Sequence, residues 1–251
     1  MIKKDSEVKK ILGSAIIGHT GYIGKFIKEN RADIKNFYNS QNINKIRNNL
    51  FDIVYLTAPS SLKFYANKFP KEDHKNIISL INHLKKIKCN KIIYFSSTDI
   101  NNAKKNKNNF YGLNRLKIEK FIKKNFKKYL IIRLPSLFGG NLKKNFFYDI
   151  LNNKPLKFYN SKTKLQWYFL GNIFKDINYL EKSRIRVANL VSEPISCLEI
   201  TKYLKIKNLG FDDNLPVYNY NYKYLIKKNK MKYLYTKKQI LRKMKLIYSN
   251  Y

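Results

Sequence analysis

Two side chains near the middle of the chain, Tyr111 and Arg115, have the types and the spacing for proton-transfer chemistry. They lie four residues apart in a segment whose pattern predicts a helix, so they share one face of it. A tyrosine phenol has a reference pKa of about 10, and an adjacent cation lowers that pKa by favouring the phenolate. The pair is therefore a candidate general acid/base. The alternative is packing, since one tyrosine among 20 can begin a helix without reacting.

A glycine-rich turn follows the first apolar run of the chain. Gly18, Gly21 and Gly24 are spaced three apart and stand just before a helical pattern. Glycine allows a sharp turn from strand to helix and a close approach by a pyrophosphate, and the helix N-terminus supplies free N–H groups. The turn predicts a dinucleotide-binding loop, with an ordinary glycine turn as the alternative. The expected loop residues are Gly18, Thr20, Gly21, Tyr22, Ile23 and Gly24.

The elements that must position these residues alternate along the first half of the chain. Apolar runs rich in Ile, Val, Tyr and Phe predict strands at residues 11–17, 34–38, 51–58, 91–96 and 129–134. The clearest helical patterns are residues 71–88 and 111–124. Strands that alternate with helices predict right-handed crossovers and an α/β doubly wound parallel sheet.

Beyond residue 134, proline and glycine break this alternation. We predict one nucleotide-binding domain over residues 1–160 and a smaller substrate-binding cap over residues 161–251, partly interleaved with the first. The stretch 101–109, rich in Asn and Lys, predicts a mobile loop.

The composition is strongly basic, with Lys+Arg 52 against Asp+Glu 16 and a formal net charge of +36. This charge raises nucleic acid or an anionic membrane as a partner. The excess is mostly Lys, which lacks the planar fork of Arg, and it is spread along the chain. We therefore expect a solvated basic surface and no specific nucleic-acid site, with a field that attracts anionic small molecules.

Cysteine and histidine are too few to build a metal site or a disulfide framework. Cys89 and Cys197 lie far apart, and His19, His74 and His83 have no spacing typical of a metal pair. We predict no metal. The lack of a disulfide framework predicts an intracellular, cytoplasmic protein. No apolar stretch is long enough to span a bilayer, so we expect no membrane insertion.

Four segments, taken together, resemble the extended short-chain dehydrogenase/reductase superfamily, the NAD(P)-dependent epimerases, dehydratases and reductases of sugars. The segments are the GxxGxxG loop and residues 52–58, 92–99 and 111–120. The likeness covers roughly residues 10 to 140 and continues loosely toward the C-terminus. It implies a Rossmann-type fold with a small C-terminal cap, NAD or NADP as cofactor, and a small-molecule substrate such as a nucleotide sugar. It also implies a homodimer formed through the helices at 71–88 and 111–124.

The resemblance assigns roles to the candidate catalytic residues. It makes Tyr111 the general acid/base and gives the hydroxyl after the fourth strand the task of orienting the substrate oxygen. Thr98 matches that hydroxyl best and Ser97 second, while a hydroxyl-rich turn is the alternative reading. The superfamily pattern is Tyr-x-x-x-Lys, and here the fourth position is Arg115. Arginine keeps the charge, but its planar fork does not replace a lysine conservatively.

The same resemblance suggests further cofactor contacts at the ends of strands. An acidic residue after the second strand would bind the adenosine ribose of NAD, and this chain has Asn39 and Ser40 there. With Lys45 and Arg47 close in sequence, the choice between NAD and NADP stays open. The remaining expected contacts are Leu56, Thr57, Ala58 and Pro135.

The sequence therefore predicts an NAD(P)-dependent oxidoreductase or epimerase that acts on a sugar, with Tyr111 as general acid/base and Arg115 keeping it poised. The alternative is a non-catalytic protein that binds NAD(P) and senses its redox state, which the departure at Arg115 favours.

Overall fold

The computed structural model describes residues 12–103, 108–207, 210–224 and 231–251. The chain divides into two compact units, residues 1–132 and 133–251. We describe each unit by itself.

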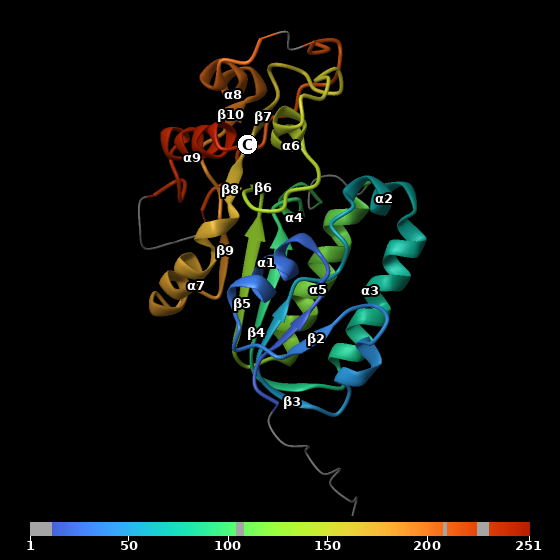
Figure 1. The fold of residues 1–251 in the computed structure, drawn as a ribbon. Helices are drawn as coiled ribbons and strands as arrows, with labels where there is room; N and C mark the ends of the chain where they lie inside the picture. Colours follow the sequence, from blue (N-terminus) through green and yellow to red (C-terminus); the bar gives the residue numbers. More distant parts are fainter. Residues whose placement is uncertain (1–11, 104–107, 208–209, 225–230) are drawn as a thin grey trace, which may run out of the picture. The chain divides into compact units, whose positions relative to one another are not determined.

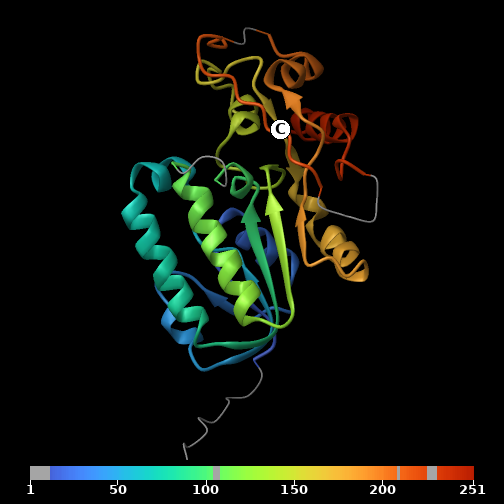
Figure 2. The ribbon, with the colours of Figure 1, turned by 180° about the vertical axis from the view of Figure 1, so that it is seen from behind.

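The first unit is a parallel sheet with helices on both faces. The sheet order is β2-β1-β3-β4-β5, and β1 pairs in parallel with both β2 and β3. The green arrows of β4 and β5 point the same way (Figure 2). The elements in chain order are β1 (Ala15–Ile17), α1 (Tyr22–Asn30), β2 (Asn36–Tyr38), η1 (Ile43–Ile46), β3 (Leu50–Leu56), α2 (Lys63–Lys68), α3 (Pro70–Leu84), β4 (Lys88–Ser97), α4 (Ile100–Ala103), α5 (Phe110–Asn125) and β5 (Tyr129–Leu134).

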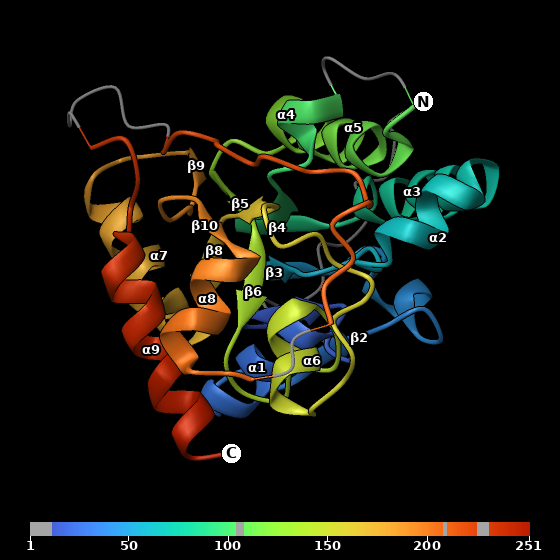
Figure 3. The same cartoon turned by 90° about the horizontal axis from the view of Figure 1, so that it is seen from above.

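The order of strands reverses direction at β1, because the chain moves from β1 outward to β2 and then returns past β1 to β3. Strands β2, β3, β4 and β5 are labelled in Figure 1. Helix α1 lies on one face of the sheet, and α3 and α5 lie on the other (Figure 3). This is the doubly wound α/β arrangement that the sequence predicts. In such sheets ligands bind at the carboxyl ends of the strands, beside the point where the order reverses.

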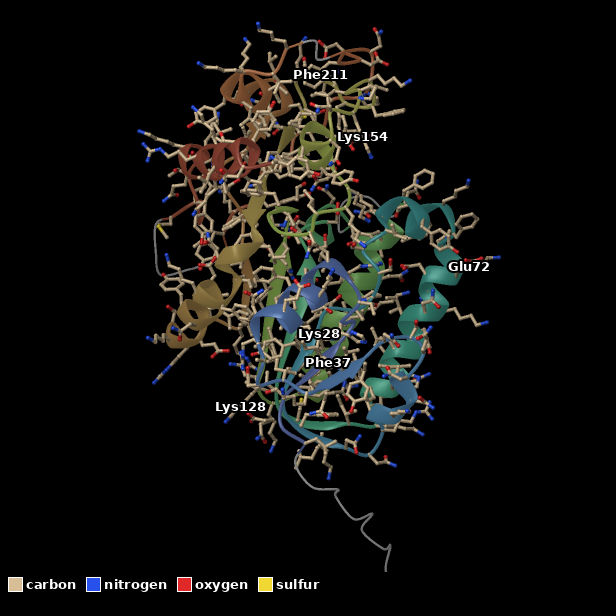
Figure 4. The ribbon with its side chains drawn as sticks, viewed as in Figure 1. Lys28, Phe37, Glu72, Lys128, Lys154 and Phe211 are labelled. Carbon is tan, nitrogen blue, oxygen red and sulfur yellow. The ribbon has the colours of Figure 1, made fainter. Side chains whose placement is uncertain are left out.

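The helices form where the sequence places apolar stripes beside helix-starting signals. In α3, Pro70 occupies the first turn, Glu72 and Asp73 lie near the positive end of the helix dipole, and Ile77 and Leu84 are buried. Helix α1 packs on the opposite face, where the Lys28 ammonium lies 4.8 Å from the ring centroid of Phe37 in β2 (Figure 4).

Two local predictions need correction. The helix expected to run to residue 88 ends at Leu84, because the apolar stripe stops there and Lys88 already begins β4, where its N–H donates to the Asn49 carbonyl. The stretch 101–109 is not a loop throughout, because Ile100–Ala103 form α4 and bury Ile100 and Ala103. Residues 104–107 of that stretch lie outside the described residues.

The second unit begins inside β5 and has its own aromatic core. Strand β6 pairs in parallel with β8, and β7 pairs with β10 in antiparallel orientation. The elements are β6 (Ser136–Phe138), α6 (Phe146–Leu151), β7 (Lys164–Leu165), β8 (Trp167–Phe169), η2 (Leu170–Asn172), α7 (Ile173–Lys182), β9 (Val187–Asn189), β10 (Ile195–Ser196), α8 (Cys197–Leu204) and α9 (Lys237–Ser249).

The chain divides near residue 133, whereas the sequence predicts the division at residue 160. The core of the second unit explains the difference. Phe138 and Phe147 from the first part of the unit pack edge-on to one another, and Phe138 does the same with Trp167. The sole tryptophan, Trp167, is fully buried there. Residues 133–160 therefore pack with the C-terminal segment.

Among the residues that the structure describes, no helix combines the length and the apolar character that crossing a membrane requires. The same described part of the chain holds no group of three or more His, Cys, Asp and Glu side chains that could hold a metal ion.

Candidate active site

The glycine loop connects the end of β1 to the start of α1. Gly18 adopts φ +94°, a conformation that L side chains rarely take, and its N–H donates to the Tyr38 carbonyl at 2.7 Å. Helix α1 then begins after Gly21, which makes no side-chain capping hydrogen bond. The N-terminus of a helix presents backbone N–H groups and a partial positive charge, which together favour the binding of an anion.

Two of the three glycines are required by the protein itself. A Cβ on Gly18 would lie 2.7 Å from the Ala58 nitrogen, and a Cβ on Gly24 would collide with the Gly18 carbonyl oxygen. The Thr57 hydroxyl holds the loop against the end of β3, because it donates to the Ile17 carbonyl at 3.0 Å and to the Gly18 carbonyl at 2.9 Å. The loop therefore packs against the end of β3 with no room for side chains at these two positions.

Gly21 is different, because nothing in the protein requires it to be glycine. Its φ of −76° suits any residue, and a Cβ there would meet only the Gly18 carbonyl oxygen at 3.4 Å, an ordinary contact. Gly21 is also exposed. Glycine is also an acceptable N-cap residue, and its lack of a side chain leaves the helix N-terminus open to a close ligand such as a pyrophosphate.

The other predicted cofactor residues lie in several environments. Thr20 is exposed beside Gly21, and Tyr22 and Ile23 are half-buried in the first turn of α1. At the end of β2, Ser40 is exposed, and the Asn39 side-chain oxygen accepts the Gln41 N–H at 2.9 Å.

At the end of β3, Leu56 is buried and Thr57 and Ala58 are half-buried beside the glycine loop. The structure therefore brings these three residues together with Gly18. Pro135 belongs to the second unit, between β5 and β6. Arg47, considered for NADP, donates from Nε to His83 Nδ1 at 3.2 Å.

The start of α5 positions Tyr111. Asn109 caps the helix by accepting the Gly112 N–H at 3.1 Å, and it donates to the Asp99 carbonyl at 3.2 Å. A Cβ on Gly112 would lie 2.7 Å from that same carbonyl oxygen, so the glycine lets α5 lie close to the end of β4. The Tyr111 N–H donates to Asn67 Oδ1 at 2.9 Å. Contacts with α2 and with the turn after β4 thus fix the start of α5, which carries Tyr111.

Tyr111 is 8% exposed, and burial raises the pKa of its phenol. The Arg115 guanidinium and a hydrogen bond from the Ser97 side chain lower that pKa only in part. The phenol is therefore protonated at neutral pH in the protein alone, which is the state of a general acid.

Arg115 lies against the ring of Tyr111 and is held by other groups. Its guanidinium carbon is 3.8 Å from the ring centroid, and Nη1 donates to the Asp73 carboxylate at 2.9 Å. Nη2 donates to the Ser60 carbonyl. The side chains of Arg115 and Asp73 are 3% and 9% exposed, so the ion pair is buried.

Of the two candidate hydroxyls, the structure places Ser97 against Tyr111. Thr98 is 5% exposed, and its backbone carbonyl accepts the Asn101 N–H at 3.0 Å. Ser96 is buried in β4.

Sequence reasoning missed three charged residues around this site. Asp73 pairs with Arg115, and Lys63 pairs with Asp99 at 2.6 Å. Asp99 directly follows the hydroxyl run, which is a signal that could have found it. Asp73 and Lys63 give no such signal, because each meets its partner only through the fold.

Neither a scan against protein-family models nor a search of curated proteins found a match. Solved structures do match. The chain is similar to UDP-N-acetylglucosamine 4-epimerase from Methanobrevibacter ruminantium M1 in complex with UDP-N-acetylmuramic acid, at 13% identity and a TM-score of 0.63, over 96% of this chain and 98% of that one. It is also similar to dTDP-4-dehydrorhamnose reductase from Yersinia enterocolitica, at 15% identity and a TM-score of 0.65, over 95% and 100% of the two chains.

A third similar structure is UDP-glucuronic acid 4-epimerase from Bacillus cereus in complex with UDP-glucuronic acid and NAD. The identity is 16% and the TM-score 0.55, over 83% of this chain and 85% of that one. The likenesses confirm the predicted fold class: the chain has the Rossmann-type α/β fold of these enzymes.

Proposed function

We propose that this protein binds NAD or NADP and acts as an oxidoreductase or epimerase on a nucleotide sugar, with Tyr111 as its general acid/base. The observation that carries the proposal is Gly21. It is exposed at a helix N-terminus, and neither its φ nor its packing requires glycine. The missing side chain leaves room for a pyrophosphate to approach the backbone.

The residues that would hold the dinucleotide lie along the carboxyl ends of β1, β2 and β3. The loop from Gly18 to Gly24 would bind the pyrophosphate, and Asn39 and Ser40 would face the adenosine ribose. Leu56, Thr57 and Ala58 would line the cleft. When bound, the nicotinamide supplies hydride transfer. The choice between NAD and NADP is left to the binding experiment below.

Tyr111 would carry the proton. Buried and protonated, it can donate to a substrate oxygen that gains charge, and it can accept the proton again in the reverse direction. Ser97 holds the phenol in place, and Thr98 remains a second candidate for the substrate oxygen. The charge of Arg115 on the ring face lowers the pKa of the phenol part of the way toward neutrality.

The substrate class comes from two sources. The similar structures are of enzymes whose names specify UDP- or dTDP-linked sugars. A net charge of +36 also raises the local concentration of such anionic substrates near the protein. The expected homodimer and the cytoplasmic localisation stay predictions.

The first experiment is calorimetric titration with NAD⁺, NADH, NADP⁺ and NADPH at moderate salt. Gly21→Asp places a carboxylate at the pyrophosphate position and is expected to abolish binding. Asn30→Asp is the matched control, because it adds the same charge at the exposed far end of the same helix and is expected to bind as the unaltered protein does. If none of the four dinucleotides binds to the unaltered protein, the proposal is wrong.

A second function, redox sensing without catalysis, is favoured by the contacts of Arg115. Its two terminal nitrogens already donate to Asp73, the Ser60 carbonyl and the Tyr111 carbonyl. Turnover of UDP- and dTDP-linked sugars separates the two functions: nicotinamide absorbance follows a net oxidation or reduction, and chromatography of the sugar follows epimerisation, which leaves the nicotinamide unchanged overall. Turnover that Tyr111→Phe abolishes while dinucleotide binding persists supports the enzyme. Tight dinucleotide binding without turnover of any sugar tested supports the sensor.

A further inference from the structure

A chain of polar contacts leads from the Tyr111 phenol to the surface. The phenol and the Ser97 hydroxyl are joined by a side-chain hydrogen bond, and the Ser97 hydroxyl donates to Asp99 Oδ2 at 3.3 Å. The other carboxylate oxygen of Asp99 accepts a hydrogen bond from Lys63 Nζ at 2.6 Å. The four residues come from α2, the end of β4 and α5, all within the first unit.

The direction of these hydrogen bonds follows from the donors that are present. Ser97 has one hydroxyl proton, which goes to Asp99, and its oxygen also accepts the Asp99 N–H at 3.2 Å. The hydrogen bond from Ser97 lowers the pKa of the Tyr111 phenol, so it stabilises the phenolate. Loss of the phenol proton would leave Ser97 to turn its own proton toward the phenolate, which would release the Asp99 oxygen that it now occupies. The state of Tyr111 and the charge at Asp99 are thus coupled.

Exposure increases outward along the same chain. Tyr111 is 8% exposed, the Asp99 side chain 17% and the Lys63 side chain 41%. The chain of contacts thus joins a buried phenol to a cation, Lys63, that water can reach. Its ion pair with Asp99 is partly buried, so it is screened less than a surface pair.

None of the other charged and titratable groups described around the phenol is a cation that reaches Ser97 through Asp99. Arg115, on the same helix, lies on the ring face and is neutralised by Asp73 of α3. Tyr94 of β4 is fully buried and uncharged, because burial raises the pKa of its phenol well above the ordinary value. Asp99 follows β4 and is the negative group nearest to Ser97.

We propose that Lys63 and Asp99 are positioning residues that control the protonation of Tyr111 through Ser97, with Lys63 as the second cation of the site. The proposal rests on the proposed role of Tyr111 as the general acid/base. Lys63 favours the phenolate, and Asp99 alone opposes it. While the phenol is protonated, Asp99 accepts the Ser97 proton and Lys63 holds Asp99.

The test places 3-fluorotyrosine at position 111 of the full chain and follows its ¹⁹F resonance with pH. Fluorine acidifies the phenol, which brings its titration into a range where the protein is folded. Lys63→Met is expected to raise the titration midpoint by about half a pH unit or more, and Asp99→Asn to lower it. Lys63→Arg is expected to stay near the unaltered midpoint because it keeps the charge. Lys68→Met, in the same helix, is the matched control and is expected to leave the midpoint unchanged.

The ¹⁹F measurement needs neither cofactor nor turnover, so it tests the role of Lys63 independently of the proposed function. If the midpoint moves as expected but no dinucleotide binds, the coupling stands and the proposed function falls. If dinucleotides bind and Lys63→Met moves the midpoint no more than Lys68→Met, or the resonance does not titrate in any variant, the role of Lys63 is overturned. Circular dichroism of each variant shows that a shift does not reflect unfolding.

Discussion

The guanidinium carbon of Arg115 lies 3.8 Å from the centroid of the Tyr111 ring. This cation–π contact places positive charge on the face of the ring, while the phenol oxygen is directed to Ser97. An arginine can hold this place because its flat fork stacks on the ring and still donates to Asp73 and to the Ser60 carbonyl. Arg115 therefore serves the packing of the site as well as its charge.

Removal of the Arg115 charge should destabilise the first unit. In Arg115→Met the buried Asp73 carboxylate loses its cation and keeps the hydrogen bond from the Asn114 amide at 2.6 Å, so we expect a loss of about 3 kcal/mol in the free energy of unfolding. Asp73→Asn combined with Arg115→Met should recover part of this loss, since the buried charge is then gone. Urea denaturation of the single and double variants measures both. A loss of less than about 1 kcal/mol in the single variant would show that the pair contributes little to stability.

Serine substitutions at two glycines of one loop should separate folding from binding. Gly18→Ser forces a side chain into positive φ and against the Ala58 nitrogen, so we expect a loss of more than about 1 kcal/mol. Gly21→Ser supplies a good N-cap residue in open space and should change stability by less than about 0.5 kcal/mol while weakening dinucleotide binding. Thermal unfolding and calorimetry measure the two effects. Equal destabilisation by both variants would contradict the distinction.

The sequence predicted those parts of the fold that local pattern determines. The strand expected at 129–134 has those bounds in the structure, because the apolar run stands between two lysines and a proline. The predicted end of α3 is four residues too late, because residues 85–88 are lysines and an isoleucine that fit a helical pattern as well as a strand. In the structure the Lys88 N–H donates to the Asn49 carbonyl, and Lys88 pairs with Leu50 of β3. This pairing makes Lys88 the first residue of β4.

The same distinction applies to the site. Tyr111 and Arg115 share a face because they are four residues apart, and the glycine loop lies within one turn of chain. The pairs Lys63–Asp99 and Asp73–Arg115 are separated by 36 and 42 residues. No spacing rule links positions so distant, and only the packing of α2 and α3 beside α5 brings them together.

The aromatic core of the second unit offers a test with its own probe. Phe138 is fully buried and packs edge-on to Trp167, with 6.2 Å between ring centroids. Phe138→Ala should cost about 3–5 kcal/mol because it leaves a cavity. Trp167 fluorescence during urea unfolding measures this loss directly, since it is the sole tryptophan. Phe158→Ala is the control, because Phe158 is 74% exposed and should change stability little. Similar losses in both variants would contradict this description of the core.

The stability of the second unit should depend on pH through Glu199. Burial would raise the pKa of this carboxyl, but hydrogen bonds from Lys237 and Ser196 outweigh it and hold the pKa below its ordinary value. A carboxyl whose pKa is lower in the folded than in the unfolded state stabilises the fold above its unfolded pKa, and this stabilisation is lost as the pH falls through the folded pKa. The residue also completes the capping box of α8 and lines a polar cavity of about 390 Å³.

Glu199→Gln should therefore destabilise the protein at about pH 7 and differ less from the unaltered protein at about pH 4, where the carboxylate is increasingly protonated. Because the Glu199 side chain is 41% exposed, we expect only a modest difference at neutral pH. Glu29→Gln is the control, since Glu29 pairs with Lys25 at 3.7 Å on an exposed helix face and should change stability little at either pH. Urea denaturation at several pH values measures the difference. If the effect of Glu199→Gln were as large at pH 4 as at pH 7, the charge of Glu199 would not be its cause.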